Sequence, residues 1–127
     1  MSGLVLDAGA LIAIDRDDRA VLSRIQAAKE KNQPIRTNAM ALAQVWRDGR
    51  GRQANLAKAL HDIVVEPVPA EDGRRAGELL GATRLKDAID ASVALLVGPG
   101  DRVLTSDPGD LRRLCDVAGN GAVVVDC

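Results

Sequence analysis

Aromatic residues are almost missing from this chain, which contains one tryptophan and no tyrosine or phenylalanine. This scarcity argues against modules that read single-stranded nucleic acid by stacking bases on aromatic rings, such as RNA-recognition motifs and single-strand-binding barrels. The core has to be built from alanine, valine, leucine and isoleucine. Such small and branched residues suit helices that pack on a buried parallel sheet.

Cysteine and histidine, the residues that bind soft metals or form crosslinks, are also scarce. The chain has two cysteines and one histidine, His61. Cys115 and Cys127 form neither a disulfide framework nor the spacing of a zinc site, so we expect two reduced thiols. We find no basic leader and no apolar span of about 18 residues, and we expect a soluble, cytoplasmic protein. The net charge of -1 excludes a general basic coat for nucleic acids.

Short apolar runs alternate with helical patterns along all 127 residues, a usual length for one domain. We find no repeat and no long linker, so we expect a single domain over residues 1–127. Five strands are predicted, at 4–6, 34–37, 63–68, 102–105 and 122–125. Helical segments lie between them, among them 70–82, 87–97 and 108–117. This alternation predicts an α/β fold with one parallel sheet and helices on both faces.

Acidic residues gather where ligand sites form in such sheets, beyond the carboxyl ends of the strands. Asp7 directly follows the first strand, Asp107 follows the fourth strand by one serine, and Asp90 lies in the first turn of a helix. Asp87 and Asp110 add carboxylates in the same kinds of position. Carboxylates without histidine or cysteine among them are hard oxygen ligands, which favour Mg²⁺ or Mn²⁺ over zinc.

Helix capping is a second interpretation of the same residues. An aspartate before a helix accepts hydrogen bonds from the first free amides, and an acidic first turn interacts favourably with the helix dipole. Asp87 and Asp110 fit this role well, and Asp107 before Pro108 fits it less well. Asp7 has few structural reasons to end a buried apolar strand, which favours a functional role for it.

Three segments resemble the motifs of the PIN-domain family. The run Leu4-Val-Leu-Asp-Ala-Gly-Ala-Leu-Ile-Ala is similar to the opening strand and helix of that family. The run Ile89-Asp-Ala-Ser-Val-Ala resembles its helix with a central aspartate, and Val103-Leu-Thr-Ser-Asp-Pro-Gly-Asp-Leu resembles its Thr-x-Asp strand end. Their order and spacing match over essentially the whole chain, and its size matches the VapC-type toxins.

The resemblance implies a Mg²⁺-dependent endoribonuclease, with Mn²⁺ able to substitute, that is the toxin of a toxin–antitoxin pair. It implies RNA as substrate, a cognate antitoxin as protein partner, a homodimer and the strand order 3-2-1-4-5. The catalytic and metal-binding residues would be Asp7, Asp90 and Asp107. Thr105 and Ser106 would support them by hydrogen bonds to a carboxylate or a phosphate, although Thr105 also suits a strand as a β-former.

One position departs from the family pattern. Gln44 stands where the family has a glutamate, two residues before Trp46. An amide oxygen can still ligate a metal, but one negative charge is lost. Asp87 or Asp110 would then supply a further carboxylate. The alternative is a catalytically impaired PIN-like domain that acts only by binding RNA or protein.

Basic residues indicate where a substrate would bind. Arg47, Arg50 and Arg52 form the densest cluster and are the predicted RNA contacts, although charge runs on helices are usually just solvated faces. Arg112 and Arg113 form a second cluster. Trp46 is interpreted as a core or dimer-interface residue rather than a base-stacking platform, because apolar Leu42 lies one helical turn before it.

A phospho-acceptor receiver domain has a similar size and similar strand-end acids. That class needs an aspartate after the third strand and a lysine after the fifth. Here the third strand leads to Pro69, and the last predicted strand is followed by Asp126 and Cys127. The missing residues argue against a receiver domain.

Overall fold

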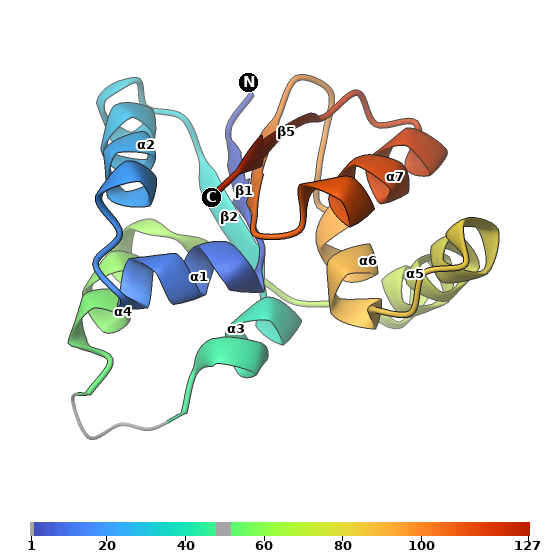
Figure 1. Cartoon of the computed structure of the whole chain (residues 1–127), viewed down its shortest axis with the longest axis horizontal. Coiled ribbons are helices and arrows are strands. Elements are labelled where there is room, and N and C mark those ends of the chain that lie inside the picture. The colour runs from blue at the N-terminus through green and yellow to red at the C-terminus, as the bar shows by residue number, and fades with distance from the viewer. Residues whose placement is uncertain (1, 48–51) are drawn as a thin grey trace.

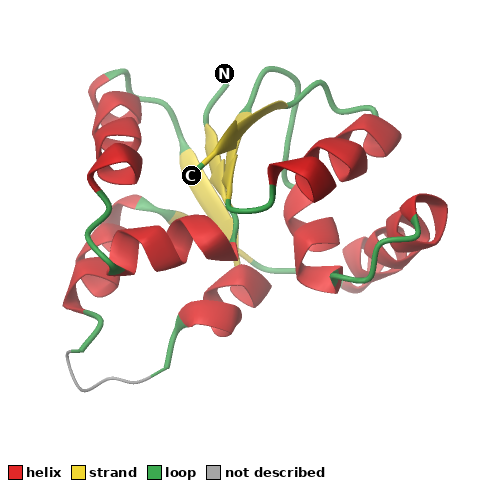
Figure 2. Ribbon diagram, in the orientation of Figure 1, coloured by secondary structure: helices red, strands yellow, loops and turns green. Residues whose placement is uncertain are grey.

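The computed structural model describes residues 2–47 and 52–127, and its centre is a parallel sheet (Figures 1 and 2). The strands follow the order β3-β2-β1-β4-β5, and every neighbouring pair is parallel. Their bounds are β1 Leu4–Leu6, β2 Ile35–Asn38, β3 Val64–Glu66, β4 Arg102–Thr105 and β5 Val123–Asp126. The predicted α/β class and the strand order 3-2-1-4-5 are therefore confirmed.

Helices lie on both sides of the sheet, with α1 to α4 on one side and α5 to α7 on the other (Figure 1). The first group is α1 Ala8–Asp15, α2 Arg19–Glu30, α3 Ala39–Val45 and α4 Ala54–Ala59, which continues into a 3₁₀ turn, η1 Leu60–Asp62. The second group is α5 Ala70–Thr83, α6 Ala88–Ala94 and α7 Pro108–Ala118. No helix among the described residues combines the length and apolar character needed to cross a membrane.

Several predicted boundaries were wrong by a few residues. The third strand covers Val64–Glu66 instead of 63–68, because the prolines at 67 and 69 supply no amide for further pairing. Helix α6 ends at Ala94 instead of 97, because the amides of Leu96 and Val97 bond to carbonyls three residues earlier and leave the α-helical pattern. The predicted break at residues 49–51 lies outside the described part of the chain.

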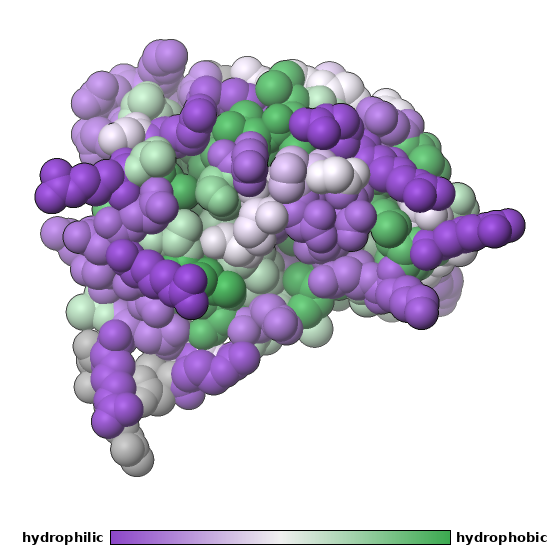
Figure 3. Space-filling model, in the orientation of Figure 1, coloured by the Kyte–Doolittle hydropathy of each residue, from purple (hydrophilic) through white to green (hydrophobic). Residues whose placement is uncertain are grey.

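Among the described residues, the apolar core is built from aliphatic side chains together with the Cys115 thiol. The central strand β1 is buried on both faces, and Leu11, Ile14, Leu104 and Leu111 pack around it with almost no exposed surface. Hydrophilic side chains cover most of the face in Figure 3, with apolar ones in scattered patches. Cys115 is a buried free thiol and Cys127 an exposed one, so no disulfide links them.

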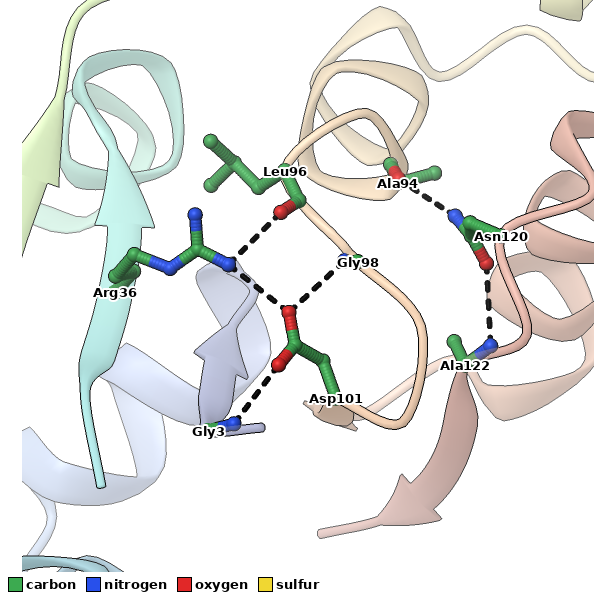
Figure 4. A network of polar contacts seen from close by, with 8 residues as sticks. All are labelled: Gly3, Arg36, Ala94, Leu96, Gly98, Asp101, Asn120 and Ala122. Carbon is green, nitrogen blue, oxygen red and sulfur yellow. Dashed lines mark hydrogen bonds and ion pairs between the residues drawn. The ribbon is translucent and has the colours of Figure 1, made fainter. Parts of the chain in front are cut away.

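A buried carboxylate fixes the amino ends of three strands (Figure 4). Asp101, only 4% exposed, accepts hydrogen bonds from the amides of Gly3 at 2.8 Å and Gly98 at 2.9 Å. The Arg36 guanidinium donates to the same carboxylate at 2.9 Å and to the Leu96 carbonyl at 3.0 Å. These bonds connect the residue before β1, the first half of β2 and the residue before β4 at the amino side of the sheet.

Asp101→Ala is expected to lower the free energy of unfolding by about 3 kcal/mol, because the amides of Gly3 and Gly98 lose their acceptor and the Arg36 guanidinium loses its counter-ion. Chemical denaturation measures the loss, with the exposed Asp116→Ala on α7 as the matched control. A loss below about 1 kcal/mol, as for an exposed ion pair, would contradict this role.

Candidate metal centre

Asp7 occupies the carboxyl end of β1 and caps α1 at the same time. Its carboxylate accepts a hydrogen bond from the Ala10 amide at 2.8 Å, and only 2% of the residue is exposed. The sequence interpretation that denied Asp7 a structural reason was therefore wrong. Burial raises the pKa of its carboxyl group above the ordinary value, while hydrogen bonds from Thr105 and Ala10 lower it.

Asp107 reaches the same edge of the sheet from the end of β4. It stands at the N-cap position of α7, but its carboxylate makes no capping hydrogen bond, and Pro108 follows it. Its backbone amide donates instead to the Thr105 hydroxyl at 2.8 Å. Capping therefore does not account for this carboxylate, which stays available for a ligand.

Three carboxylates form the densest acidic group of the described residues. Asp90, Asp107 and Asp110 each offer an oxygen, and these oxygens lie within 4.8 Å of one another. A divalent cation with ligand distances of about 2.1 to 2.6 Å separates opposite ligands by about 4 to 5 Å. An all-oxygen set with this spacing fits a hard divalent ion such as Mg²⁺ or Mn²⁺.

Asp7 is not a member of this close group but lines the same cavity of about 200 Å³. The cavity is lined by the following residues: Asp7, Ala8, Gly9, Ile12, Gln44, Asp87, Ile89, Asp90, Ser106 and Asp107. They come from α1, α3, α6 and the segments that follow β1 and β4. The predicted residues Asp7, Asp90 and Asp107 thus share one cavity, with Asp110 beside it.

Crowding of like charges is strongest at Asp90. Burial, followed by the charges of Asp87 and Asp7 and then those of Asp107 and Asp110, raises the pKa of its carboxyl group to about 7. The pKa of Asp110 is also raised, by desolvation and by the adjacent Asp107, although the Arg113 charge lowers it. A bound cation would relieve this repulsion, which makes the group a candidate for holding one.

The auxiliary residues divide into structural and cavity-facing ones. Asp87 caps α6, since its carboxylate accepts from the amides of Ile89 at 2.9 Å and Asp90 at 3.0 Å. Thr105 is fully buried and bonds both acidic strand ends, through the Asp7 carboxylate and the Asp107 amide. Ser106 is exposed and lines the cavity.

Gln44 lines the cavity from α3 and is solvent-exposed. It therefore does not point into the core, and it occupies the position at which the family pattern placed a carboxylate. The structure brings Asp110, three residues after Asp107, within reach of Asp90 instead. The third carboxylate of this close group therefore comes from the first turn of α7.

The predicted RNA contacts are not part of this cavity's lining. The Arg47 guanidinium donates to the carbonyls of Ala43 at 3.1 Å and Trp46 at 2.9 Å, which are free at the end of α3. Arg52 is exposed, and Arg50 lies outside the described residues. Trp46 follows the last residue of α3 and is 37% exposed, so it is not a core residue.

Sequence reasoning missed Gly9 as a residue of the site. Gly9 lies in the first turn of α1 against the residue after β4, and a Cβ atom there would overlap the Ser106 side chain. The bare backbone lets α1 approach the β4–α7 segment closely, so that Asp7 and Asp107 face the same cavity. The glycine two residues after the strand-end aspartate was the available signal.

Comparisons with known proteins show the fold. No protein-family model matches the chain, and a search of curated proteins also finds no match. A chain of the crystal structure of VapBC2 from Rickettsia felis, bound to a DNA fragment from its promoter, aligns with a TM-score of 0.70 at 14% identity. That alignment covers 98% of both chains.

A second structure gives the same result. A chain of DNA-bound VapBC from Salmonella typhimurium aligns with a TM-score of 0.68 at 15% identity, covering 99% of this chain and 98% of that one. At these identities the likeness shows the fold alone. The PIN-like fold implied by the sequence motifs is confirmed.

The raised pKa of Asp90 predicts a pH-dependent effect of the Asp90→Asn variant on stability. In metal-free protein the folded state keeps a proton on Asp90 that the unfolded chain releases, so this contribution is full below about pH 4 and is lost as the pH rises through about 7. Because asparagine stays neutral, the melting temperature of the variant should rise relative to wild type as the pH increases from about 4 to about 7.

Thermal melts of both proteins with a chelator measure this difference, with Asp116→Asn as the control. Saturating Mn²⁺ should reverse it, because a bound ion stabilises the wild type by mass action and the variant less. A difference that stays constant over the pH range would contradict the assigned repulsion.

Proposed function

We propose that the chain, taken as one PIN-like domain over residues 1–127, is a divalent-metal-dependent endoribonuclease and the toxin of a toxin–antitoxin pair. The observation that carries the proposal is the carboxylate group of Asp90, Asp107 and Asp110, beside a cavity lined by Asp7 at the carboxyl edge of the sheet. The full-length fold likeness to VapBC chains supports the toxin assignment.

Asp90, Asp107 and Asp110 would hold Mg²⁺ or Mn²⁺, with Asp7 at the cavity wall. Divalent ions in such clusters screen phosphodiester charge and lower the pKa of a bound water for in-line attack. The Thr105 hydroxyl accepts a hydrogen bond from the Asp107 amide, and a hydrogen bond from Thr105 lowers the pKa of the Asp7 carboxyl group, so Thr105 would support both strand-end acids. The chain offers no histidine in the cavity, and water would protonate the leaving oxygen.

Gln44 motivates a second candidate function, a PIN-like domain that binds RNA or protein without cleaving. Its amide lines the cavity where a carboxylate would add charge. The Asp110 carboxylate beside Asp90 and Asp107 favours the catalytic proposal, because the cluster keeps three negative ligands without a glutamate on α3.

Two protein partners belong to the proposal. An antitoxin is inferred because the similar structures are VapBC complexes. A homodimer is inferred from the family resemblance and from the exposed apolar side chains of Met40 and Trp46 at α3, which are 46% and 37% exposed. Light scattering of the isolated chain tests the homodimer, and a monomer mass at tens of micromolar would contradict it.

Cleavage of RNA tests the proposed function. Wild-type protein should cut labelled RNA in Mn²⁺ and stop after chelation, and Asp107→Asn should lose activity about a hundredfold or more. Asp116→Asn, on the exposed part of the same helix, should cleave like wild type. Calorimetric Mn²⁺ binding without any cleavage by the wild type would support the non-catalytic candidate instead.

Gln44→Glu is expected to tighten Mn²⁺ binding roughly tenfold, because one more negative ligand outweighs the added repulsion among the aspartates. The exposure of Gln44 means that the variant should fold normally. Calorimetric Mn²⁺ titration measures the affinity, with Gln44→Ala as the uncharged control at the same position. An affinity equal to that of Gln44→Ala would remove residue 44 from the metal site.

A further inference from the structure

A second cavity adjoins the acidic one and shares three residues with it: Gly9, Ile12 and Ser106. Its volume is about 390 Å³, within the range of roughly 300–1,000 Å³ typical of small-ligand sites. The remaining lining residues are Ala13, Arg16, Asp18 and Cys127. The two cavities therefore lie end to end along one face of α1.

Few side-chain atoms separate the two cavities. Gly9 contributes only backbone atoms there, and the Ser106 side chain fills the space that a Cβ atom on Gly9 would need. Ile12 is apolar but 36% exposed, and it borders both cavities one turn further along α1. A chain bound in the acidic cavity would therefore reach the second cavity past Gly9, Ile12 and Ser106, the residues that line both.

Charge distinguishes the second cavity from the first. Arg16 is the only positively charged residue among the described linings of the two cavities, and it makes no ion pair within the described residues. The Asp18 carboxylate accepts from the Val21 amide at 3.0 Å at the start of α2, so it is already engaged with a helix N-terminus. The guanidinium is thus the group in this cavity that is free to bind an anion.

We propose that the second cavity holds the nucleotide that neighbours the scissile phosphate of a single-stranded RNA, with Arg16 bound to a phosphate of that nucleotide. The inference rests on the proposed function, since RNA is taken as the substrate. Ile12 and Ala13 provide an apolar surface for the face of a base or sugar, and Ser106 provides a hydroxyl beside the cleavage site.

The length of α1 separates the acidic cavity at Asp7 from the proposed phosphate contact at Arg16. Its eight residues span about 12 Å, at 1.5 Å per residue, with Asp7 at one end and Arg16 at the other. Arg16 therefore contacts a different phosphate from the one that the carboxylates surround. It is a positioning residue for substrate binding, and it offsets part of the repulsion that the acidic cavity exerts on an RNA strand.

Salt-dependent RNA binding tests the proposal. The Asp107→Asn protein, which should bind without cutting, is titrated with a short fluorescent single-stranded RNA of randomised sequence, with and without Arg16→Ala. Arg16→Ala should weaken binding roughly tenfold, as for loss of one charged hydrogen-bonded contact. The slope of log affinity against log salt should fall by about 0.7, the value for one phosphate on a single strand.

Two controls separate this role from a structural one. Arg74→Ala, an exposed arginine on α5, should leave affinity and slope unchanged, and Arg16→Lys should keep most of the slope because lysine also pairs with phosphate. In cleaving protein, Arg16→Ala should raise KM and leave kcat unchanged. Equal thermal melts of all variants establish that they fold alike.

The proposal is overturned if Arg16→Ala matches Arg74→Ala in affinity and slope, or if its loss appears in kcat with KM unchanged. Failure of the proposed function gives a different result. A wild type that binds RNA with the Arg16-dependent slope but never cleaves it would contradict the nuclease and support the binding site.

Discussion

Parallel pairing of β1 with β4 is the constraint on which the rest of the structure depends. Leu4 to Leu6 lie opposite Arg102 to Leu104, and both strands are buried between helical layers. At the amino ends of these strands, the Asp101 carboxylate accepts a hydrogen bond from the Gly3 amide. At the carboxyl ends, Gly9 lets α1 approach Ser106 closely. With both ends fixed, Asp7 and Asp107 face one cavity without any direct bond between them.

Helix capping and lining of the acidic cavity fall on the same carboxylates. Asp7 caps α1 and Asp87 caps α6, and both still line the acidic cavity. Capping and metal binding are compatible, because a carboxylate has two oxygens and about four acceptor sites. Helix N-termini also carry partial positive charge, which moderates the repulsion among clustered acids. The fold thus tolerates an acidic group that would otherwise be costly to gather.

The sequence predicted most of the fold because its apolar runs are short and sharply bounded. The bounds of β1 and β4 were correct. Strand β3 is shorter than predicted because the prolines at 67 and 69 supply no amides for pairing. Helix α6 is shorter because the amides of Leu96 and Val97 bond to carbonyls three residues earlier. Within the site, pattern alone could not show that the Asp110 carboxylate joins those of Asp90 and Asp107 in one close group, while Asp7 lines the adjoining cavity. That arrangement depends on side-chain directions in the first turn of α7, which no periodicity encodes.

The single tryptophan gives the molecule an intrinsic optical probe. Without tyrosine or phenylalanine, all near-ultraviolet fluorescence of the chain comes from one indole ring, which directly follows α3. Gln44, two residues earlier on the chain, lines the acidic cavity, and the ring is partly open to solvent. Emission from this indole therefore reports on the environment of one known place, without the overlapping signals that complicate such measurements in most proteins.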